Sequence, residues 1–215
     1  MRPRLLIIGA GGHARVVISI ARQMGTWDVA GVLAREIPPK PEQIYGVPII
    51  GTYLDANRLL QAEGWHHAAL AVGDNRERAS HQSILTQLGF VFPVLLHPSA
   101  LIEHNVTLGD GCVVCAGAIL CVEVRIGYGS IVNTGAIVDH ETQVGDHAHI
   151  APGCRVAGRV NIGRGAMLGI GSSVREKISI GAGSLIGAGS VVVDDIPGGV
   201  VAYGIPARVA PPRKS

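Results

Sequence analysis

The sequence predicts two domains of different architecture: an α/β domain with a small parallel sheet over residues 1–95, and a solenoid of triangular coils over residues 96–215. Two observations predict this organisation. Strand and helix patterns alternate in the first 95 residues, which is typical of a parallel sheet. From residue 102 onward an aliphatic residue returns at every sixth position, a period that neither an α-helix nor a simple strand has.

The composition indicates thin, regular layers and excludes several classes of protein. Apolar residues make up 47% of the chain but aromatic residues only 4%, so small and aliphatic side chains must fill the core that aromatic rings commonly fill. The net charge of +2 comes without the basic stripe of a nucleic-acid-binding protein. No segment approaches the roughly 20 apolar residues of a membrane span. We therefore expect a cytoplasmic protein with neither nucleic-acid nor membrane partners.

The α/β domain is expected to alternate strands with helices. Ligands of parallel sheets bind beyond the carboxyl ends of the strands, where the glycine turns at Gly9 and Gly73 lie. Asp74 or Asn75 is suited to cap the helix that follows the second turn. The expected elements are a strand over 4–8, a turn over 9–12, a helix over 13–24, a strand over 29–33, a helix over 54–63, a strand over 68–72 and a helix that ends at 88.

The first glycine turn, Gly9-Ala10-Gly11-Gly12-His13, precedes a helix whose N-terminal N–H groups favour phosphate. Its spacing partly matches a dinucleotide-binding fingerprint. Two features argue against NAD binding. The second strand ends in Leu33-Ala34-Arg35, where an acidic residue is expected, and the domain is too short for a second mononucleotide half. A nucleotide diphosphate is favoured; the alternative is a turn that only allows strand and helix to pack closely.

The hexapeptide repeat predicts a coil with three flat sides of six residues each, with the aliphatic residue pointing inward and coils stacked about 4.8 Å apart. A small residue follows four positions later, near a corner where tight turns favour Gly, Asn or Asp; Cys112 and Cys154 take this position. The aliphatic residues are Ile102, Leu108, Val114, Leu120, Ile126, Val132, Val138, Val144, Ile150, Val156, Ile162, Leu168, Val174, Ile180, Ile186 and Val192.

The four cysteines are expected to be reduced thiols in a cytoplasmic protein. Cys112-x-x-Cys115 with Cys121 and His104 forms an alternative zinc set. Because the repeat explains the cysteines as structural residues, the sequence predicts no metal.

The repeat resembles the left-handed parallel β-helix of the hexapeptide-repeat acyltransferases, whose motif is [LIV]-[GAED]-x-x-[STAV]-x, over residues from about 100 to 196. The resemblance implies a Rossmann-like α/β domain followed by such a helix. Some of these helices are carbonic anhydrases that bind zinc through three histidines, and the cluster of His140, His147 and His149 leaves that alternative open.

His140 and Glu141 take outward positions in the hexapeptide that begins at Val138, so neither is a core residue. A neutral imidazole is the usual base at pH 7, and an adjacent carboxylate orients it and raises its basicity. His149 follows half a coil later and is expected on a different face. The alternative is a set of solvated surface histidines.

The glycine turn ahead of a hexapeptide helix with Asn133-Thr134 and Val138-Asp139-His140-Glu141 resembles the nucleotide-sugar N-acetyltransferases of the bacillosamine and perosamine pathways. Gly204-Ile205-Pro206-Ala207 is similar to the segment that closes many hexapeptide acyltransferases. The resemblance spans essentially the whole chain. It implies an acetyl-CoA-dependent enzyme of lipopolysaccharide or glycan biosynthesis, and a homotrimer with active sites between subunits.

The resemblance also implies a role for each matching residue. His140 matches the base that removes a proton from the sugar amine, Glu141 the residue that heightens its basicity, and Asn133 a polar residue beside the reacting centre. The acetyl-CoA groove is matched by His149, Ile170, Gly187 and Ala188, and the nucleotide-sugar pocket by Gly11, Gly12, His13 and Gly73.

One departure concerns the nucleotide base. Members that use UDP-sugars tend to end the second strand with an acidic pair, whereas this chain has Ala34-Arg35-Glu36. Arginine suits guanine O6 and N7, and a carboxylate accepts from guanine N–H groups. We therefore expect acetyl transfer to the 4-amino group of a GDP-linked 4-amino-4,6-dideoxyhexose such as GDP-perosamine, by direct attack without an acyl-enzyme. The alternatives are a UDP-linked bacillosamine precursor, sugar O-acetylation as in the sialic acid O-acetyltransferases, and a non-catalytic nucleotide-sugar-binding or scaffold protein.

Overall fold

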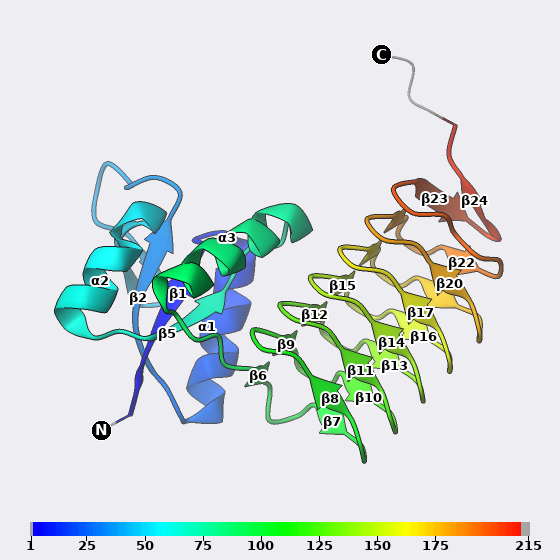
Figure 1. Ribbon diagram of the computed structural model, residues 1–215, viewed down its shortest axis with the longest axis horizontal. Coiled ribbons are helices and arrows are strands. Elements are labelled where there is room, and N and C mark those ends of the chain that lie inside the picture. The colour runs from blue at the N-terminus through cyan, green and yellow to red at the C-terminus, as the bar shows by residue number, and fades with distance from the viewer. Residues whose placement is uncertain (1, 212–215) are drawn as a thin grey trace. The chain divides into compact units, whose positions relative to one another are not determined.

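A computed structural model describes residues 2–211 and divides into two compact units with a boundary between Pro98 and Ser99 (Figure 1). The sequence-based boundary after residue 95 lies just before it. No helix within residues 2–211 has both the length and the apolar character that crossing a membrane requires.

The first unit is built on a parallel sheet with the strand order β3-β4-β2-β1-β5. Only β3, at the edge, runs antiparallel to its neighbour among these described strands. No strand pattern is evident in the sequence of β4, because Pro48 and Gly51 interrupt its short apolar run. The strands are β1 (Arg4–Ile8), β2 (Asp28–Ala34), β3 (Gln43–Ile44), β4 (Val47–Thr52) and β5 (His67–Leu70), with the short β6 (Leu95–Leu96) near the end of the unit.

The helices of this unit begin and end where local signals indicate. Of the two candidate caps, Asp74 and Asn75, it is Asp74 that caps the last helix, by accepting the N–H of Glu77 at 2.8 Å. The first helix ends at Gly25, which adopts the left-handed conformation that glycine allows. The elements are α1 (Gly12–Met24), the 3₁₀ turn η1 (Tyr53–Asp55), α2 (Ala56–Glu63) and α3 (Asn75–Leu88).

A single apolar cluster holds α2 and α3 to one face of the sheet. Leu6 and Ile8 of β1 alternate with Leu5 and Ile7, which are fully buried on the opposite face. The cluster comprises Leu6, Ile8, Leu33, Ala56, Leu59, Leu60, Trp65, Ala68, Leu70, Leu85, Phe90 and Phe92. This packing places the carboxyl ends of β1 and β5, with the turns that follow them, at one edge of the sheet.

Residues 99–211 form a left-handed parallel β-helix whose coils are visible one behind the other in Figure 1. Each two-residue strand pairs with the strand 18 residues later, so that Ile119 lies beside Ile137 and Leu120 beside Val138. An 18-residue coil with three short sides is the geometry that the hexapeptide period predicts.

Within residues 99–211 the strands form three sides, each a parallel sheet. The first side holds β7 (Leu101–Ile102), β10 (Ile119–Leu120), β13 (Ile137–Val138), β16 (Arg155–Val156), β19 (Ser173–Val174) and β22 (Val191–Val192). The second holds β8 (Thr107–Leu108), β11 (Arg125–Ile126), β14 (Gln143–Val144), β17 (Asn161–Ile162) and β20 (Ser179–Ile180). The third holds β9 (Val113–Val114), β12 (Ile131–Val132), β15 (His149–Ile150), β18 (Met167–Leu168), β21 (Leu185–Ile186) and β23 (Val201–Gly204), which is followed by the antiparallel β24 (Ala207–Val209).

The interior of the β-helix is the repeat itself. Fourteen of the sixteen repeated aliphatic residues are buried, and the other two, Ile102 and Leu108, lie in the first coil. The small residues are buried as well, and polar ones bond to the next coil: Ser130 Oγ donates to the Gly145 carbonyl at 2.9 Å. Cys112 and Cys154 make the same kind of contact, to the Gly127 and Gly169 carbonyls at 2.9 and 3.1 Å. Their structural role is confirmed.

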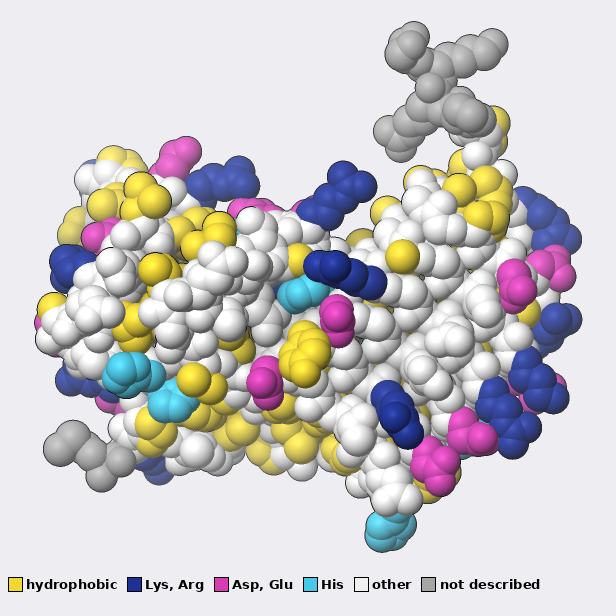
Figure 2. All heavy atoms as spheres, in the orientation of Figure 1, with side chains coloured by type: hydrophobic (Ala, Val, Ile, Leu, Met, Phe, Trp, Pro, Cys, Tyr) yellow, Lys and Arg dark blue, Asp and Glu magenta, His cyan; other side chains and the backbone are white. Residues whose placement is uncertain are grey.

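Two corners of the coil differ in the residue that adopts a left-handed backbone. The corner after the third side uses glycine and is called here the glycine corner; its left-handed residues are Gly117, Gly135, Gly153, Gly171 and Gly189. The corner after the first side uses residues with long or polar side chains, which adopt this conformation uncommonly. This charged corner consists of Asn105, Glu123, Glu141, Arg159 and Lys177, with φ between 58° and 61°. Figure 2 shows acidic and basic side chains along one edge of the helix.

Candidate active site

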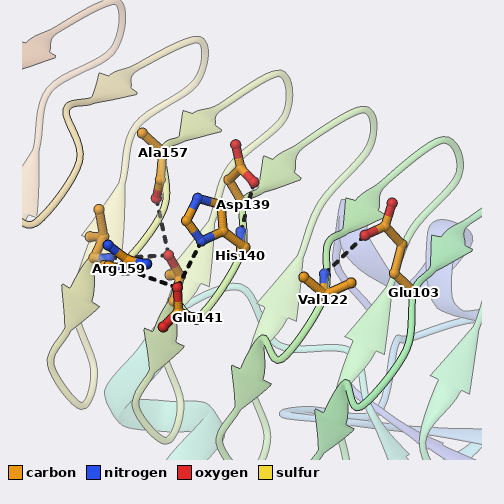
Figure 3. Close-up of polar contacts among 9 residues, drawn as sticks. Glu103, Val122, Asp139, His140, Glu141, Ala157 and Arg159 are labelled. Atoms are coloured by element: carbon orange, nitrogen blue, oxygen red, sulfur yellow. Dashed lines mark hydrogen bonds and ion pairs between the residues drawn. The ribbon is translucent and has the colours of Figure 1, made fainter.

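His140 and Glu141 lie together in the charged corner, in the turn between β13 and β14 (Figure 3). The imidazole Nδ1 is 3.0 Å from Oε2 of Glu141. Because a carboxylate only accepts, Nδ1 carries the proton of the neutral ring and Nε2 is left with a free lone pair. The backbone N–H of His140 donates to Oδ1 of Asp139 at 2.7 Å. This arrangement presents Nε2 as a base.

Arg159, one coil further along, bonds to the same carboxylate oxygen. Its Nε lies 2.7 Å from Oε2 of Glu141. Hydrogen bonds from Arg159 and then from His140 hold the pKa of the Glu141 carboxyl below its usual range. Glu141 therefore stays ionised at neutral pH and keeps accepting from the imidazole.

Gly158 lies directly against the imidazole. A Cβ placed on this residue would collide with Nε2 of His140 and would lie 2.5 Å from its Cε1. The backbone of Gly158 has no left-handed φ that requires glycine. The absence of a side chain is therefore what leaves room for the ring.

The pair remains open to solvent. The side chains of His140 and Glu141 are 43% and 42% exposed, which lets a substrate reach the ring. Beside them on the second side of the helix is a cavity of about 320 Å³, which Glu123, Arg125, Glu141, Gln143, Arg159, Val160 and Asn161 line.

Asn133 lies against His149 and on a different corner from His140. The backbone N–H of Thr134 donates to Oδ1 of Asn133 at 2.8 Å and so orients the amide. Nδ2 then points at Nε2 of the buried His149, 3.1 Å away. Because Nδ2 only donates, Nε2 of His149 accepts and its proton sits on Nδ1.

The residues expected to contact acetyl-CoA gather along the glycine corner. Ile170 and the pair Gly187-Ala188 follow strands of the third side that are 18 residues apart, and His149 lies on that side itself. Asn133, expected beside the reacting centre, lies on the same corner. Successive coils are joined there by backbone bonds, including Gly189 N–H to the Ile170 carbonyl at 2.8 Å. Ile170 is 57% exposed. In one chain this group and the His140–Glu141 pair occupy two different corners.

In the α/β unit, Gly11, Gly12 and Gly73 face open space. A Cβ on any of the three would meet no atom within 4 Å, whereas one on Gly9 would lie 2.8 Å from the Ala71 carbonyl oxygen. Gly9 thus serves packing and the other three do not. Gly11 is the N-cap of α1 without a side-chain cap, so the first N–H groups of the helix are available to an anion.

His13 lies in the first turn of α1. Burial, together with the Arg78 guanidinium nearby, lowers its pKa from 6.5 to about 4. The imidazole is therefore neutral at physiological pH.

Two residues near this edge of the sheet, Arg78 and Glu77, were not predicted from the sequence. Arg78 is fully buried and donates to the carbonyls of Val72 and Gly73 at 3.1 and 3.2 Å, which holds the second glycine turn in place. Glu77 accepts from Nη2 of Arg35 at 2.9 Å. The Arg35 side chain is 74% exposed. The only sequence signal for Glu77 is its place three residues after the N-cap Asp74, which also explains its backbone bond.

Three of the four thiols, those of Cys115, Cys121 and Cys154, are poor nucleophiles. Burial raises the pKa of Cys115 to about 12 and raises that of Cys154. The pKa of Cys121 is raised by burial and then by the carboxylates of Asp139 and Glu103. In the part of the chain that the structure describes, no group of three or more His, Cys, Asp or Glu residues is placed to hold a metal ion.

Comparison with known proteins identifies the family. The family model of the PglD N-terminal domain matches residues 4–85. No curated protein matches the chain. Among solved structures, a histidine-to-alanine variant of GDP-perosamine N-acetyltransferase from Caulobacter crescentus, in complex with CoA and GDP-perosamine, is 38% identical, with 96% of each chain covered and a TM-score of 0.92. The chain belongs to this family of sugar N-acetyltransferases.

A second solved relative has a similar sequence identity to this chain and a similar TM-score. The acetyltransferase domain of PglB from Neisseria gonorrhoeae, in complex with acetyl coenzyme A, is 35% identical, covers 98% of this chain and 100% of its own, and has a TM-score of 0.90. WeeI from Acinetobacter baumannii, 24% identical with a TM-score of 0.86, shares the fold. The sequence-based assignment to the family and to its fold is confirmed.

Family resemblance did not identify two residues of the site. Arg159 and Gly158 lie 18 residues after Glu141 and His140, and nothing in the linear sequence marks them as partners. The signal that could have found them is the coil length itself, because residues 18 apart stack.

Proposed function

We propose that the protein transfers an acetyl group from acetyl-CoA to the 4-amino group of a GDP-linked 4-amino-4,6-dideoxyhexose, with His140 as general base. The observation that carries the proposal is the 3.0 Å contact between Nδ1 of His140 and Glu141, which leaves Nε2 unprotonated at an exposed position. The relative from Caulobacter crescentus, in complex with CoA and GDP-perosamine, supports the substrate class.

The reaction is a direct displacement. The sugar nitrogen forms a bond to the thioester carbonyl carbon, a backbone N–H stabilises the oxyanion, and the C–S bond then breaks. Nε2 of His140 takes the proton that the amine loses and returns it to the CoA thiolate. Glu141 holds the ring in the Nδ1–H tautomer and stabilises the imidazolium while it carries this proton. A covalent cysteine route is disfavoured because the thiols have raised pKa values.

The nucleotide sugar is assigned to the edge of the α/β unit. Gly11, Gly12 and Gly73 leave open space there, and the N-terminus of α1 offers N–H groups to the diphosphate. His13 supplies a neutral hydrogen-bonding group. Arg35, with Glu77 beside it, provides a donor and an acceptor suited to guanine; Glu77 takes the accepting role that the sequence suggested for Glu36.

Acetyl-CoA is assigned to the glycine corner, where His149, Ile170, Gly187 and Ala188 line the coils. Small residues let the pantetheine arm lie close to the backbone, and Asn133 holds His149. Because this corner and His140 are separate in one chain, a neighbouring copy must complete each site. We therefore assign the protein to a homotrimer with active sites between subunits. Sedimentation equilibrium tests this: a monomer at enzymatic concentrations contradicts it.

The decisive experiment measures release of CoA thiol from acetyl-CoA with GDP-linked and UDP-linked 4-amino-4,6-dideoxyhexoses side by side. Turnover with the GDP-sugar, and its loss in His140→Ala, is the expected result. Preference for the UDP-sugar would overturn the assignment of guanine as the nucleotide base. If neither sugar caused release of CoA thiol, sugar O-acetylation would be favoured instead. Near-native turnover by His140→Ala would exclude His140 as the base.

A further inference from the structure

We propose that Arg159 is a positioning residue for the His140–Glu141 pair, and that it sets the pH range in which His140 works as a base. The inference rests on the proposed function of His140. It concerns a residue that touches no reacting atom and acts through Glu141.

The first argument is geometric. Oε2 of Glu141 receives both Nδ1 of His140 at 3.0 Å and Nε of Arg159 at 2.7 Å (Figure 3). The carboxylate is 42% exposed, so a single bond to His140 leaves it free to rotate towards water. The second, shorter bond removes this freedom and keeps the accepting oxygen in front of Nδ1.

The position of Arg159 is itself tied to His140. The backbone N–H of Arg159 donates to the carbonyl of His140 at 2.9 Å, and the residue adopts φ of 60° in the charged corner. The left-handed conformation is uncommon for a residue with a side chain. Main chain and side chain of Arg159 thus contact two consecutive residues, His140 and Glu141, on the preceding coil.

The second argument is electrostatic. A carboxylate favours the imidazolium, and a nearby guanidinium offsets that effect. The other charged groups that face the pair are Asp139, whose carboxylate accepts the His140 N–H, and Glu123 and Arg125 along the same cavity. With Arg159 in place, the negative charge of Glu141 is compensated. Without Arg159, the surrounding carboxylates favour the imidazolium.

A structural role in stability does not explain the contact. Both side chains are about half exposed, and exposed ion pairs contribute little to folding because solvent screens them. We therefore expect Arg159→Gln to unfold at nearly the wild-type temperature, while its catalytic properties change.

The test compares Arg159→Gln with Arg125→Gln. The control removes a positive charge from the same cavity, and among the described residues no hydrogen bond joins Arg125 to Glu141. In Arg159→Gln, the acidic limb of the kcat/KM profile is expected to move to higher pH by about 0.5 unit, the size expected of one nearby charge in an exposed site. The value of kcat should fall by roughly threefold to tenfold, with KM for both substrates changed less than twofold. Arg159→Lys should restore the position of the limb, since it restores the charge.

An identical pH profile in Arg159→Gln and Arg125→Gln would overturn the proposal. A rise in KM without a fall in kcat would overturn it as well. Proton NMR of the His140 ring, assigned by its absence in His140→Ala, gives a readout that does not need catalysis. A titration midpoint that does not move in Arg159→Gln overturns the electrostatic role even if His140 is not the base. Conversely, active His140→Ala overturns the proposed function and leaves the NMR result standing.

Discussion

Nδ2 of Asn133 lies 3.1 Å from Nε2 of His149, across two neighbouring coils of the β-helix. The Thr134 N–H at 2.8 Å fixes which way the amide points. The contact therefore determines the tautomer of His149, whose Nδ1 carries the proton. Asn133 is thereby a partner of His149 within the chain, on a different corner from His140.

Removal of this partner should weaken the acetyl-CoA site. In Asn133→Ala the tautomer of His149 is no longer selected, and we expect KM for acetyl-CoA to rise about tenfold. The acidic limb assigned to His140 should stay in place. Steady-state kinetics with calorimetric titration of CoA measures both. Thr134→Val keeps the orienting backbone N–H and serves as the control; unchanged CoA binding in Asn133→Ala would contradict the role.

Gly158→Ala should displace the base. The three atoms that a Cβ would meet first all belong to the His140 ring, so the ring must turn away from its position beside Glu141. We expect kcat to fall about tenfold or more while the fold persists, because the ring is partly exposed and can move.

A double-mutant cycle isolates the cause in Gly158→Ala. Gly158→Ala should lower the thermal unfolding temperature in the wild-type background, where the new methyl collides with the ring. In the His140→Ala background the collision is absent, so the same substitution should leave that temperature unchanged. An equal shift in both backgrounds would place the effect in the backbone of Gly158 and not in its contact with the ring.

The α/β unit should lose stability in acid because of His13. The unfolded chain takes up a proton at His13 near pH 6.5, but the folded protein only near pH 4, so unfolding is coupled to proton uptake between these values. The free energy of unfolding contributed by this site should decrease by about 3 kcal/mol as pH falls through that window.

Urea unfolding at pH 7 and pH 4.5, followed by tryptophan fluorescence, measures this effect, since both tryptophans, Trp27 and Trp65, lie in the α/β unit. His13→Gln should flatten the pH dependence, whereas His66→Gln, at an exposed position, should not. A slope that persists unchanged in His13→Gln would assign the proton uptake to other groups.

Catalysis should not pass through a cysteine. With thiol pKa values raised by burial, the folded protein should react slowly with a thiol reagent at pH 8, and Cys121→Ser should keep kcat within about twofold. Mass spectrometry after one turnover, with digestion at low pH, checks for an acetylated cysteine. Finding one would replace direct displacement by a two-step route.

The strongest sequence signals were periodic or local. Sixteen aliphatic positions six residues apart predicted the coil. Asp74 and Asn75, ahead of a polar helix, were the two residues predicted to cap it, and Asp74 does so. The weak points were segments without such a signal. The strand β4 contains Pro48 and Gly51, and its place in the sheet is decided by pairing with β2.

The residues of the candidate site also differed in how far the sequence could predict them. Adjacent residues such as His140 and Glu141 could be recognised together, because their contact is local. Glu77 was missed as the partner of Arg35, since 42 residues separate them and only the folded unit brings the first turn of α3 within 2.9 Å of the residue that follows β2.

By itself the sequence determined the β-helix and its 18-residue coil, because a three-sided coil turns residues six apart toward one interior. Resemblance in short motifs, such as the one that contains His140 and Glu141, indicated the family. Only the tertiary structure decided what lies beside each functional group. Gly158 and Arg159 meet His140 and Glu141 because a closed coil stacks residues 18 apart, and Asn133 meets His149 because strands of one side end at one corner. The physical reason is that burial acts on residue type, which a sequence displays, whereas hydrogen bonds and collisions depend on positions in space that only the folded coil defines.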